Sequence, residues 1–202
     1  MKKVSKPFNL IILGDPGAGK ATQAKYFCKK YHLYDFDMGV ELFLARKHNK
    51  DIDQALKDTV DQGNLAPTKI VREIYRNKLK SVFNKTGILF DGTPRMVGEA
   101  KMLRGLLKEN KSFPTMVLFL KITPQEAIKR IAKRRGYGGK ARADDRIQAL
   151  QNRFKYYREK VTVTTEYFQK HYFFESINAK GSILEVRAKI QKAIDKYLKT
   201  LD

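Results

Sequence analysis

The feature near the N-terminus that most constrains the fold is a short apolar run followed by a glycine-rich turn and a helix-forming segment. Phe8–Leu13 is the apolar run, Gly14–Lys20 reads G-D-P-G-A-G-K, and Lys20–Tyr31 has helical composition. The turn fits the pattern G-x-x-x-x-G-K, in which glycines let backbone N–H groups wrap a phosphate and the lysine neutralises the outer phosphates. The N-terminus of the following helix adds partial positive charge. The sequence therefore predicts a phosphate-binding loop between a buried strand and a helix.

Apolar runs and helical segments alternate along the rest of the chain. Further strands are predicted at 87–90, 116–120 and 172–177, and helices at 51–62, 67–83, 98–110, 124–135, 144–171 and 183–198. This alternation predicts a parallel sheet covered by helices on both faces. Ligands of such sheets bind beyond the carboxyl ends of the strands, where loops 14–20, 91–95 and 178–182 are expected.

Composition narrows the class of protein. The 202 residues fit one domain, and 42 Lys+Arg against 21 Asp+Glu give a formal net charge of +21, which favours anionic partners. The single cysteine, Cys28, excludes a disulfide framework and a cysteine-based zinc site. No apolar run approaches the ~18–20 residues of a membrane span, and no secretory leader is recognised, so we expect a soluble cytoplasmic protein with no membrane partner.

Four motifs together resemble the adenylate kinases and related nucleoside monophosphate kinases. Gly14–Gln23, G-D-P-G-A-G-K-A-T-Q, is similar to their G-x-P-G-x-G-K-G-T-Q loop, including a threonine at the second position after the lysine. The other three are Asp91–Arg95 (D-G-T-P-R, resembling D-G-F-P-R), Arg142–Asp145 with Arg153 (resembling R-x-D-D…R), and Arg130-x-x-x-Arg134. Their order and spacing match over nearly the whole chain.

The resemblance implies a P-loop three-layer α/β/α fold with a parallel five-stranded sheet. It implies a single nucleoside monophosphate kinase domain over 1–202, with a helical acceptor-binding insert at 37–66 (the acceptor insert) and a short lid at 135–143. The implied reaction moves the γ-phosphoryl group of ATP to a nucleoside monophosphate, with AMP as first choice (ATP + AMP = 2 ADP). Magnesium bound with ATP, no zinc and a monomeric state are also implied.

Residue roles follow from the same resemblance. ATP binding is assigned to Gly14, Pro16, Gly17, Ala18, Gly19, Lys20, Ala21, Thr22, Arg130 and Arg134. Acceptor binding is assigned to Met38, Gly39, Phe43, Arg46, Gly92, Arg95, Glu99, Arg142 and Arg153. Catalysis by positioning and charge neutralisation is assigned to Lys20, Arg95, Arg130, Arg134, Arg142 and Arg153, and magnesium binding through water to Asp91.

Three positions of the acceptor site depart from the family pattern. Met38 replaces a threonine and Phe43 replaces an arginine that binds the acceptor phosphate. Arg46 lies nearly one turn further on, and we hypothesise that it reaches the same phosphate. Glu99 stands where the family has a glutamine that reads adenine, and an ionised glutamate accepts from an amino group but cannot donate. The acceptor base therefore stays open between AMP and CMP, UMP or another monophosphate.

A second class of function fits the charge: a nucleic-acid-binding P-loop protein with vestigial kinase activity. The set of arginines argues against this second class. A protein that only binds nucleic acid does not need an R-x-D-D…R lid at this spacing from a D-G-x-P-R loop. Without the seven predicted phosphate-binding cations the net charge is still +14, mostly from scattered lysines. This surplus fits faster capture of anionic nucleotides, salt adaptation, a lysine-biased composition or a polyanionic partner, with nucleic acid as a secondary partner.

Overall fold

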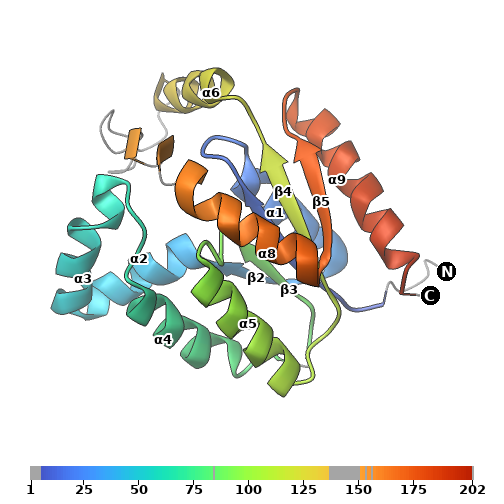
Figure 1. Ribbon diagram of the computed structural model, residues 1–202, viewed down its shortest axis with the longest axis horizontal. Helices are drawn as coiled ribbons and strands as arrows, with labels where there is room; N and C mark the ends of the chain where they lie inside the picture. The colour runs from blue at the N-terminus through green and yellow to red at the C-terminus, as the bar shows by residue number, and fades with distance from the viewer. Residues whose placement is uncertain (1–5, 84, 137–150, 153, 156, 202) are drawn as a thin grey trace.

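A five-stranded parallel sheet forms the centre of the protein (Figure 1). The computed structural model describes residues 6–83, 85–136, 151–152, 154–155 and 157–201. The strands are β1 (Asn9–Gly14), β2 (Tyr34–Asp37), β3 (Ile88–Asp91), β4 (Thr115–Lys121) and β5 (Phe173–Asn178), in the spatial order β2-β3-β1-β4-β5. All neighbouring strands pair in parallel, so the predicted α/β fold class is confirmed.

Helices cover both faces of the sheet. One face packs against α1 (Lys20–Tyr31) and α9 (Ile183–Leu198), and the other against α4 (Thr68–Leu79), α5 (Val97–Glu109) and α8 (Thr162–His171). After β2 come α2 (Met38–His48), α3 (Lys50–Lys57) and a 3₁₀ turn (Val60–Gln62), whereas α6 (Pro124–Gly136) follows β4. A π-helical turn (Tyr157–Val161) precedes α8.

Strand β1 is buried on both of its faces, which shows that the sheet lies between two layers of helices. All six of its residues are buried, as expected for a parallel strand with a helical layer on each side. Leu10 and Ile12 belong to the apolar cluster with α1 and α9, whereas Ile11 and Leu13 belong to the cluster with α4, α5 and α8. This alternation follows from the two-residue period of a strand.

The structure differs from the sequence prediction in three elements. The helix predicted at 51–62 ends at Lys57 and is followed by the 3₁₀ turn, because Thr59 leaves helical geometry (φ −123°, ψ −76°). Strand β2 was not predicted, since Phe36 is its only fully buried residue. The helix predicted at 144–171 is interrupted by the π-helical turn, and its first residues, 144–150, lie outside the described part of the chain.

Because the strands are parallel, their carboxyl ends meet at one edge of the sheet. The loops after β1, β3 and β5, which are the three predicted from the sequence, therefore share that edge. Within the described ranges, no helix is both long enough and apolar enough to cross a membrane.

Candidate active site

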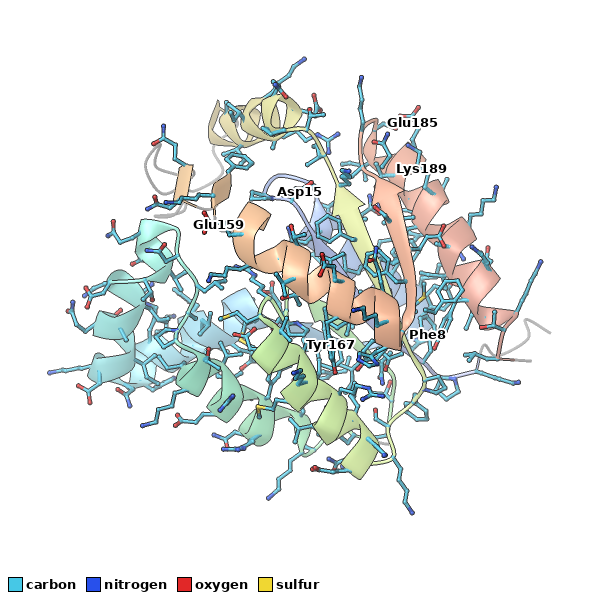
Figure 2. All side chains as sticks on the ribbon, viewed as in Figure 1. Phe8, Asp15, Glu159, Tyr167, Glu185 and Lys189 are labelled. Atoms are coloured by element: carbon cyan, nitrogen blue, oxygen red, sulfur yellow. The ribbon has the colours of Figure 1, made fainter. Side chains whose placement is uncertain are left out.

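The loop from Gly14 to Lys20 joins the end of β1 to the start of α1. Gly17 and Gly19 have φ values of 79° and 86°, a backbone region that favours glycine. A Cβ placed on Gly17 would lie 3.0 Å from the carbonyl oxygen of Ala127, so the loop packs closely against α6. Asp15 accepts a hydrogen bond from the backbone N–H of Ile122 at 2.8 Å, and its position on the loop is visible in Figure 2. The loop is thus fixed to both β4 and α6.

Lys20 folds back over this loop. Its Nζ donates to the carbonyl oxygens of Gly14 at 2.7 Å and Asp15 at 3.0 Å. A Cβ placed on Gly92, in the loop after β3, would lie 3.9 Å from Lys20 Cε and 3.3 Å from Arg95 Nη2. The ammonium of the phosphate loop and the guanidinium of the D-G-T-P-R loop are therefore brought close together.

Two carboxylates, Asp37 and Asp91, end the neighbouring strands β2 and β3 and are register partners. Asp91 is only 8% exposed. Burial and the nearby charge of Asp37 together raise the pKa of Asp91 to about 6, and Lys20 opposes the shift. Asp37 caps α2, because its Oδ1 accepts from the N–H groups of Gly39 (2.8 Å) and Val40 (3.3 Å). A cation bound on the cavity side of Asp91 would stabilise the ionised form of this buried carboxylate.

Arg95 is held by its neighbours on both backbone and side chain. Its Nε donates to the carbonyl oxygen of Gly92 at 2.6 Å, and its own carbonyl accepts from Thr164 Oγ1 at 2.9 Å. Glu99, which is 3% exposed, accepts through Oε2 from the N–H groups of Arg95 (2.9 Å) and Met96 (3.3 Å). Burial raises the pKa of Glu99, and those two backbone hydrogen bonds oppose the shift. Glu99 thus positions the loop that carries Arg95.

Arg130 links α6 to the loop after β5. Its Nε donates to Glu126 at 2.8 Å, and its Nη2 donates to the carbonyl oxygens of Ala179 (3.0 Å) and Gly181 (3.1 Å). The guanidinium therefore lies beside the 178–182 loop, at the side of the phosphate loop where α9 begins. Arg134 follows one turn later on α6.

One cavity of about 770 Å³ connects these loops. Its walls are formed by 17 residues: Gly17, Ala18, Gly19, Lys20, Ala21, Thr22, Asp37, Gly39, Asp91, Gly92, Arg95, Arg130, Ile131, Gly181, Ser182, Ile183 and Val186. Most of the predicted ATP-binding residues, together with Gly39, Asp91, Gly92 and Arg95 from the other predicted groups, are therefore gathered in one place.

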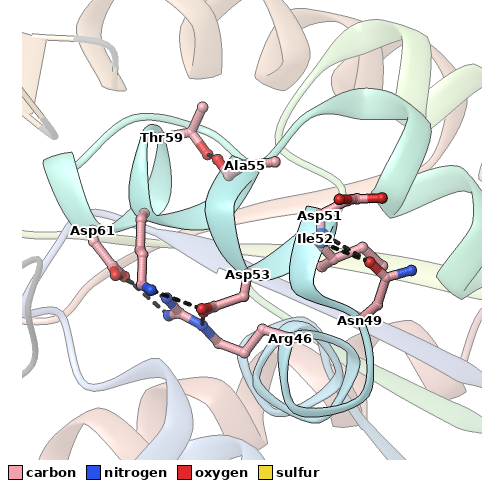
Figure 3. Close-up of polar contacts among 9 residues, drawn as sticks. Arg46, Asn49, Asp51, Ile52, Asp53, Ala55, Thr59 and Asp61 are labelled. Carbon is pink, nitrogen blue, oxygen red and sulfur yellow. Dashed lines mark hydrogen bonds and ion pairs between the residues drawn. The ribbon is translucent and has the colours of Figure 1, made fainter.

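Arg46 lies elsewhere, inside the acceptor insert (Figure 3). Its Nε pairs with Asp53 Oδ1 at 2.7 Å, and its Nη1 and Nη2 reach the two carboxylate oxygens of Asp61 at 3.2 and 3.0 Å. Asp61 and Asp53 together raise the pKa of Arg46 above its ordinary value. To reach an acceptor phosphate, the guanidinium must exchange at least one of these carboxylates for it.

The remaining predicted residues fall into three groups. Gly14 and Pro16 are buried in the phosphate loop, outside the cavity wall. Met38 is buried at the start of α2, whereas Phe43 is 53% exposed and carries Lys47 Nζ 4.4 Å from its ring centroid. Arg142 and Arg153 lie outside the described residues.

Four cavity residues had no place in the sequence prediction: Asp37, Ile131, Ile183 and Val186. Asp37 was missed together with the short strand that carries it. Ile131 directly follows Arg130, and Ile183 and Val186 follow the loop predicted at 178–182. Their closeness in sequence to predicted site residues is the signal that could have found them.

A second cavity, of about 860 Å³, lies between α8 and the strands β4 and β5. Its walls include Phe119, Phe154 and Phe174, and its charged groups are Lys121 with the carboxylates Asp15 and Glu166. Two carboxylates against one lysine make this second cavity unsuitable for negatively charged phosphates. The cavity beside Lys20 is therefore the candidate active site.

The donor set at the carboxyl edge fits a hydrated magnesium ion. Magnesium in nucleotide enzymes usually keeps several waters and contacts one or two carboxylates plus substrate phosphates. Asp91 and Asp37 supply such a pair, and in the described part of the chain no group of three or more His, Cys, Asp or Glu could hold a metal ion by itself. Asp91 is therefore the residue that would hold the ion through its waters.

Comparison with known proteins agrees with this geometry. The family model described as adenylate kinase matches residues 12–173. The chain is 34% identical over 189 residues to the adenylate kinase of Azobacteroides pseudotrichonymphae, covering 93% of this chain and 97% of that protein. It is 29% identical over 187 residues to the adenylate kinases of Parabacteroides distasonis (93% and 97% covered) and Bacteroides fragilis (93% and 98% covered). With the phosphate loop and the D-G-T-P-R loop opening into one cavity, the chain belongs to the adenylate kinase family and is an enzyme of phosphoryl transfer to nucleoside monophosphates.

Proposed function

We propose that the enzyme transfers the γ-phosphoryl group of ATP to AMP and so interconverts ATP plus AMP with two ADP. The observation that supports this most is the single cavity that joins Lys20 of the phosphate loop to Arg95 of the loop after β3. One fixed cation stands on the donor side and one on the acceptor side, which is the arrangement that transfer between two phosphates needs.

On the donor side, the backbone of Gly17–Thr22 and the ammonium of Lys20 bind the β- and γ-phosphates. Lys20 then exchanges its carbonyl partners, Gly14 and Asp15, for phosphate oxygens. Arg130 and Arg134 add charge from α6. The apolar walls made by Ile131, Ile183 and Val186 suit the flat face of the donor base.

On the acceptor side, Arg95 holds the phosphate of the monophosphate, and Gly92 lines the cavity beside it. Met38, Gly39, Phe43 and Arg46 are proposed on the side of α2, and Glu99 beside the acceptor base. Arg142 and Arg153 are proposed to bring further positive charge to the transferring group, as the resemblance implies.

The chemistry is positioning and charge neutralisation. An oxygen of the acceptor phosphate forms a bond to the γ-phosphorus while the bond from that phosphorus to the bridging oxygen breaks. Magnesium bound with ATP would neutralise phosphate charge, and Asp91 would hold it through water. Lys20 and the arginines stabilise the charge that spreads over the transferring group, so no side chain acts as a nucleophile.

A related acceptor, CMP, is the alternative that Glu99 leaves open. Glu99 presents a carboxylate where a donating amide is expected, and the amino groups of both cytosine and adenine can donate to it. We place AMP first because the named relatives are adenylate kinases.

A coupled phosphotransfer assay with ATP, magnesium and each of AMP, CMP, UMP, GMP and dAMP tests the proposal. We expect the highest kcat/KM with AMP. Higher kcat/KM with CMP would replace AMP as the acceptor and keep the reaction. Absence of turnover with all five would overturn the proposed function.

Three variants test which residues bind ATP and which bind the monophosphate. Because Arg95 is placed on the acceptor side and Arg130 on the donor side, we expect Arg95→Ala to raise the KM for the monophosphate and Arg130→Ala to raise the KM for ATP, each about tenfold or more, the loss of one charge-assisted contact. Lys20→Ala should lower kcat by at least a hundredfold, since its charge is needed most in the transition state. Equal effects of Arg95→Ala on both KM values would contradict the assignment.

Monomeric state and cytoplasmic location are proposed on the family resemblance. Light scattering during size-exclusion chromatography tests the first, with a mass near 23.4 kDa expected. Fractionation of the source cells tests the second.

A further inference from the structure

Two neighbouring helices, α4 and α5, carry a dense set of exposed basic side chains on the face of the sheet opposite α1 and α9. The two helices pack side by side (Figure 1). Eight exposed residues define what we call the α4–α5 basic surface: Lys69, Arg72, Arg76 and Lys80 on and just after α4, and Lys101, Arg104, Lys108 and Lys111 on and just after α5.

The spacing of these residues places each set in a row. Steps of three, four and four residues separate the α4 set, and steps of three, four and three separate the α5 set. Residues three or four apart share one face of a helix. On α4 that face lies opposite buried residues such as Ile70 and Ile74, and on α5 it lies beside the buried residues Leu103 and Leu107. Each row is about 15 Å long at 1.5 Å per residue.

The two rows start at the same end. Thr68 Oγ1, at the N-terminus of α4, lies 3.8 Å from Met96 Sδ, which immediately precedes α5. A Cβ placed on Gly98 would lie 4.0 Å from Arg72 Nη2, so the guanidinium of Arg72 lies against the first turn of α5. The two rows therefore run alongside each other on helices whose axes lie the usual ~8–10 Å apart.

Few carboxylates of the described residues lie near the positive charges of this surface, although Arg72 acts on the buried carboxylate of Glu99. Among the residues that the structure describes, none of the eight forms an ion pair with a carboxylate. By contrast, Lys78 of α4 forms an ion pair with Glu41 at 3.2 Å, and Lys196 of α9 forms one with Glu175. Of the carboxylates on the two helices, Glu99 is buried, whereas Glu73 and Glu109 are exposed, so eight exposed cations face two exposed carboxylates.

The chemistry of the surface indicates the kind of partner. The exposed large apolar side chains in the described ranges lie on α1, α2, α6, α8 and α9, and none on α4 or α5. Insertion into a lipid surface needs apolar anchors, and binding of single strands needs aromatic rings on which bases stack. Cations in two parallel rows without either group suit the phosphates of a double helix.

We propose that the α4–α5 basic surface binds the phosphate backbone of double-helical nucleic acid without preference for base sequence. None of its eight residues lines the nucleotide cavity, so this binding is separate from the phosphotransferase reaction. It goes beyond the proposed function and gives a role to part of the positive charge that nucleotide binding leaves unused.

The test uses two charge-matched variants of the full chain. Lys80→Gln, Lys101→Gln and Lys108→Gln together remove three charges from the surface. Lys29→Gln, Lys192→Gln and Lys199→Gln remove three exposed lysines from α1, α9 and the residue after α9, so the net charge of the two triple variants is equal. Fluorescence anisotropy measures binding of labelled RNA and DNA duplexes of about 20 base pairs between roughly 50 and 200 mM salt.

We expect the parent and the control variant to bind both duplexes with similar affinity. The surface variant should bind at least tenfold more weakly, and the slope of log affinity against log salt should fall by about 2.7, since each lost phosphate contact contributes about 0.9 for DNA. Unchanged phosphotransferase activity shows that both variants are folded. Arg76→Gln with Arg104→Gln provides a second variant, and the same loss of binding is expected.

Several outcomes would overturn the proposal. Equal weakening in the two triple variants would show that diffuse charge alone is responsible. Competition by saturating magnesium–ATP would place binding in the nucleotide cavity. Binding to vesicles of anionic lipid but not to duplexes would identify a membrane surface as the partner, and binding of neither at the lowest salt would show that the surface is only solvated.

Discussion

The guanidinium of Arg46 is shared between Asp53 and Asp61, and it is the one cation of the acceptor insert for which we propose a ligand. We expect Arg46→Ala to raise the acceptor KM about tenfold, the loss of one charge-assisted contact (about 1.4 kcal/mol), and to lower the melting temperature. Steady-state kinetics with varied monophosphate and thermal unfolding measure the two effects.

The matched control for this prediction is Asp61→Asn. It removes one carboxylate partner and leaves the guanidinium in place, so it should lower the melting temperature without raising the acceptor KM. If Arg46→Ala lowers the melting temperature and leaves the acceptor KM unchanged, Arg46 is a structural residue of the insert and the phosphate is bound by other groups.

Glu99 gives a prediction about pH. Burial raises its pKa in the folded protein above the unfolded value, so the charged carboxylate lowers the free energy of unfolding at neutral pH. That cost disappears as the pH falls below the ordinary glutamate pKa of about 4.3. Glu99→Gln keeps an oxygen to accept from the N–H groups of Arg95 and Met96 and removes the charge.

We therefore expect Glu99→Gln to melt at a higher temperature than the parent at pH 7, with the difference shrinking towards pH 4. Glu109→Gln, an exposed position on the same helix, is the control and should change the melting temperature little. A lower melting temperature for Glu99→Gln at pH 7 would mean that the full negative charge on Glu99 is what holds the Arg95 loop.

At the scale of elements, the start of α9 is closed by a reciprocal pair of hydrogen bonds. Glu185 Oε2 accepts from the N–H of Ser182 at 2.7 Å, and Ser182 Oγ accepts from the N–H of Glu185 at 3.2 Å; Figure 2 labels Glu185 at this end of the helix. These bonds lower the pKa of Glu185. The stability they contribute is present above the unfolded-state pKa and is lost as the pH falls through the lower folded-state value.

We expect Glu185→Ala to lower the melting temperature at pH 7, with an effect that shrinks as the pH falls through the lowered folded-state pKa of Glu185. Ser182→Ala should cost about 1 kcal/mol of unfolding free energy, the usual value of a helix cap. Both variants should also raise the KM for ATP, because Gly181 in the same loop accepts from Arg130. Denaturant unfolding and steady-state kinetics measure these effects. An unchanged ATP KM would show that the helix cap does not influence the ATP-binding site.

Elements with a local signal could be predicted from the sequence. The phosphate loop depends on glycines and a lysine within seven residues, and β1 and β4 are apolar because helices cover both of their faces. Strand β2 lacks such a signal, since it lies at the edge of the sheet and only Phe36 is fully buried. Asp37 was missed with it.

The partners of the site residues were less predictable. Arg46 meets Asp53 and Asp61 only because α2, α3 and the 3₁₀ turn pack together, and no sequence pattern encodes that packing. Glu99 accepts from residues three and four positions earlier, which is a local bond, but Met96 at the cap position hides the usual Ser/Thr-x-x-Glu signal.

At the scale of the whole molecule, the net charge of +21 predicts how the reaction responds to salt. A strongly positive protein concentrates anionic nucleotides around itself and speeds their encounter, and added salt screens this attraction. We expect kcat/KM for the monophosphate to fall about threefold or more between roughly 20 and 300 mM potassium chloride, while kcat stays nearly constant. A parallel fall of kcat would show instead that salt disturbs bound charges in the cavity.

The order of the sheet has a further consequence for the geometry of transfer. The donor loop continues β1 and the acceptor loop continues β3, and these strands are direct neighbours, with Gly92 N–H bonded to the carbonyl oxygen of Ile12 at 3.0 Å. Neighbouring strands lie about 4.8 Å apart. The separation of the donor loop from the acceptor loop is therefore set by backbone hydrogen bonds between two central strands of the sheet, and a substitution in the outer helices that leaves this pairing intact should leave the spacing of the two substrates unchanged.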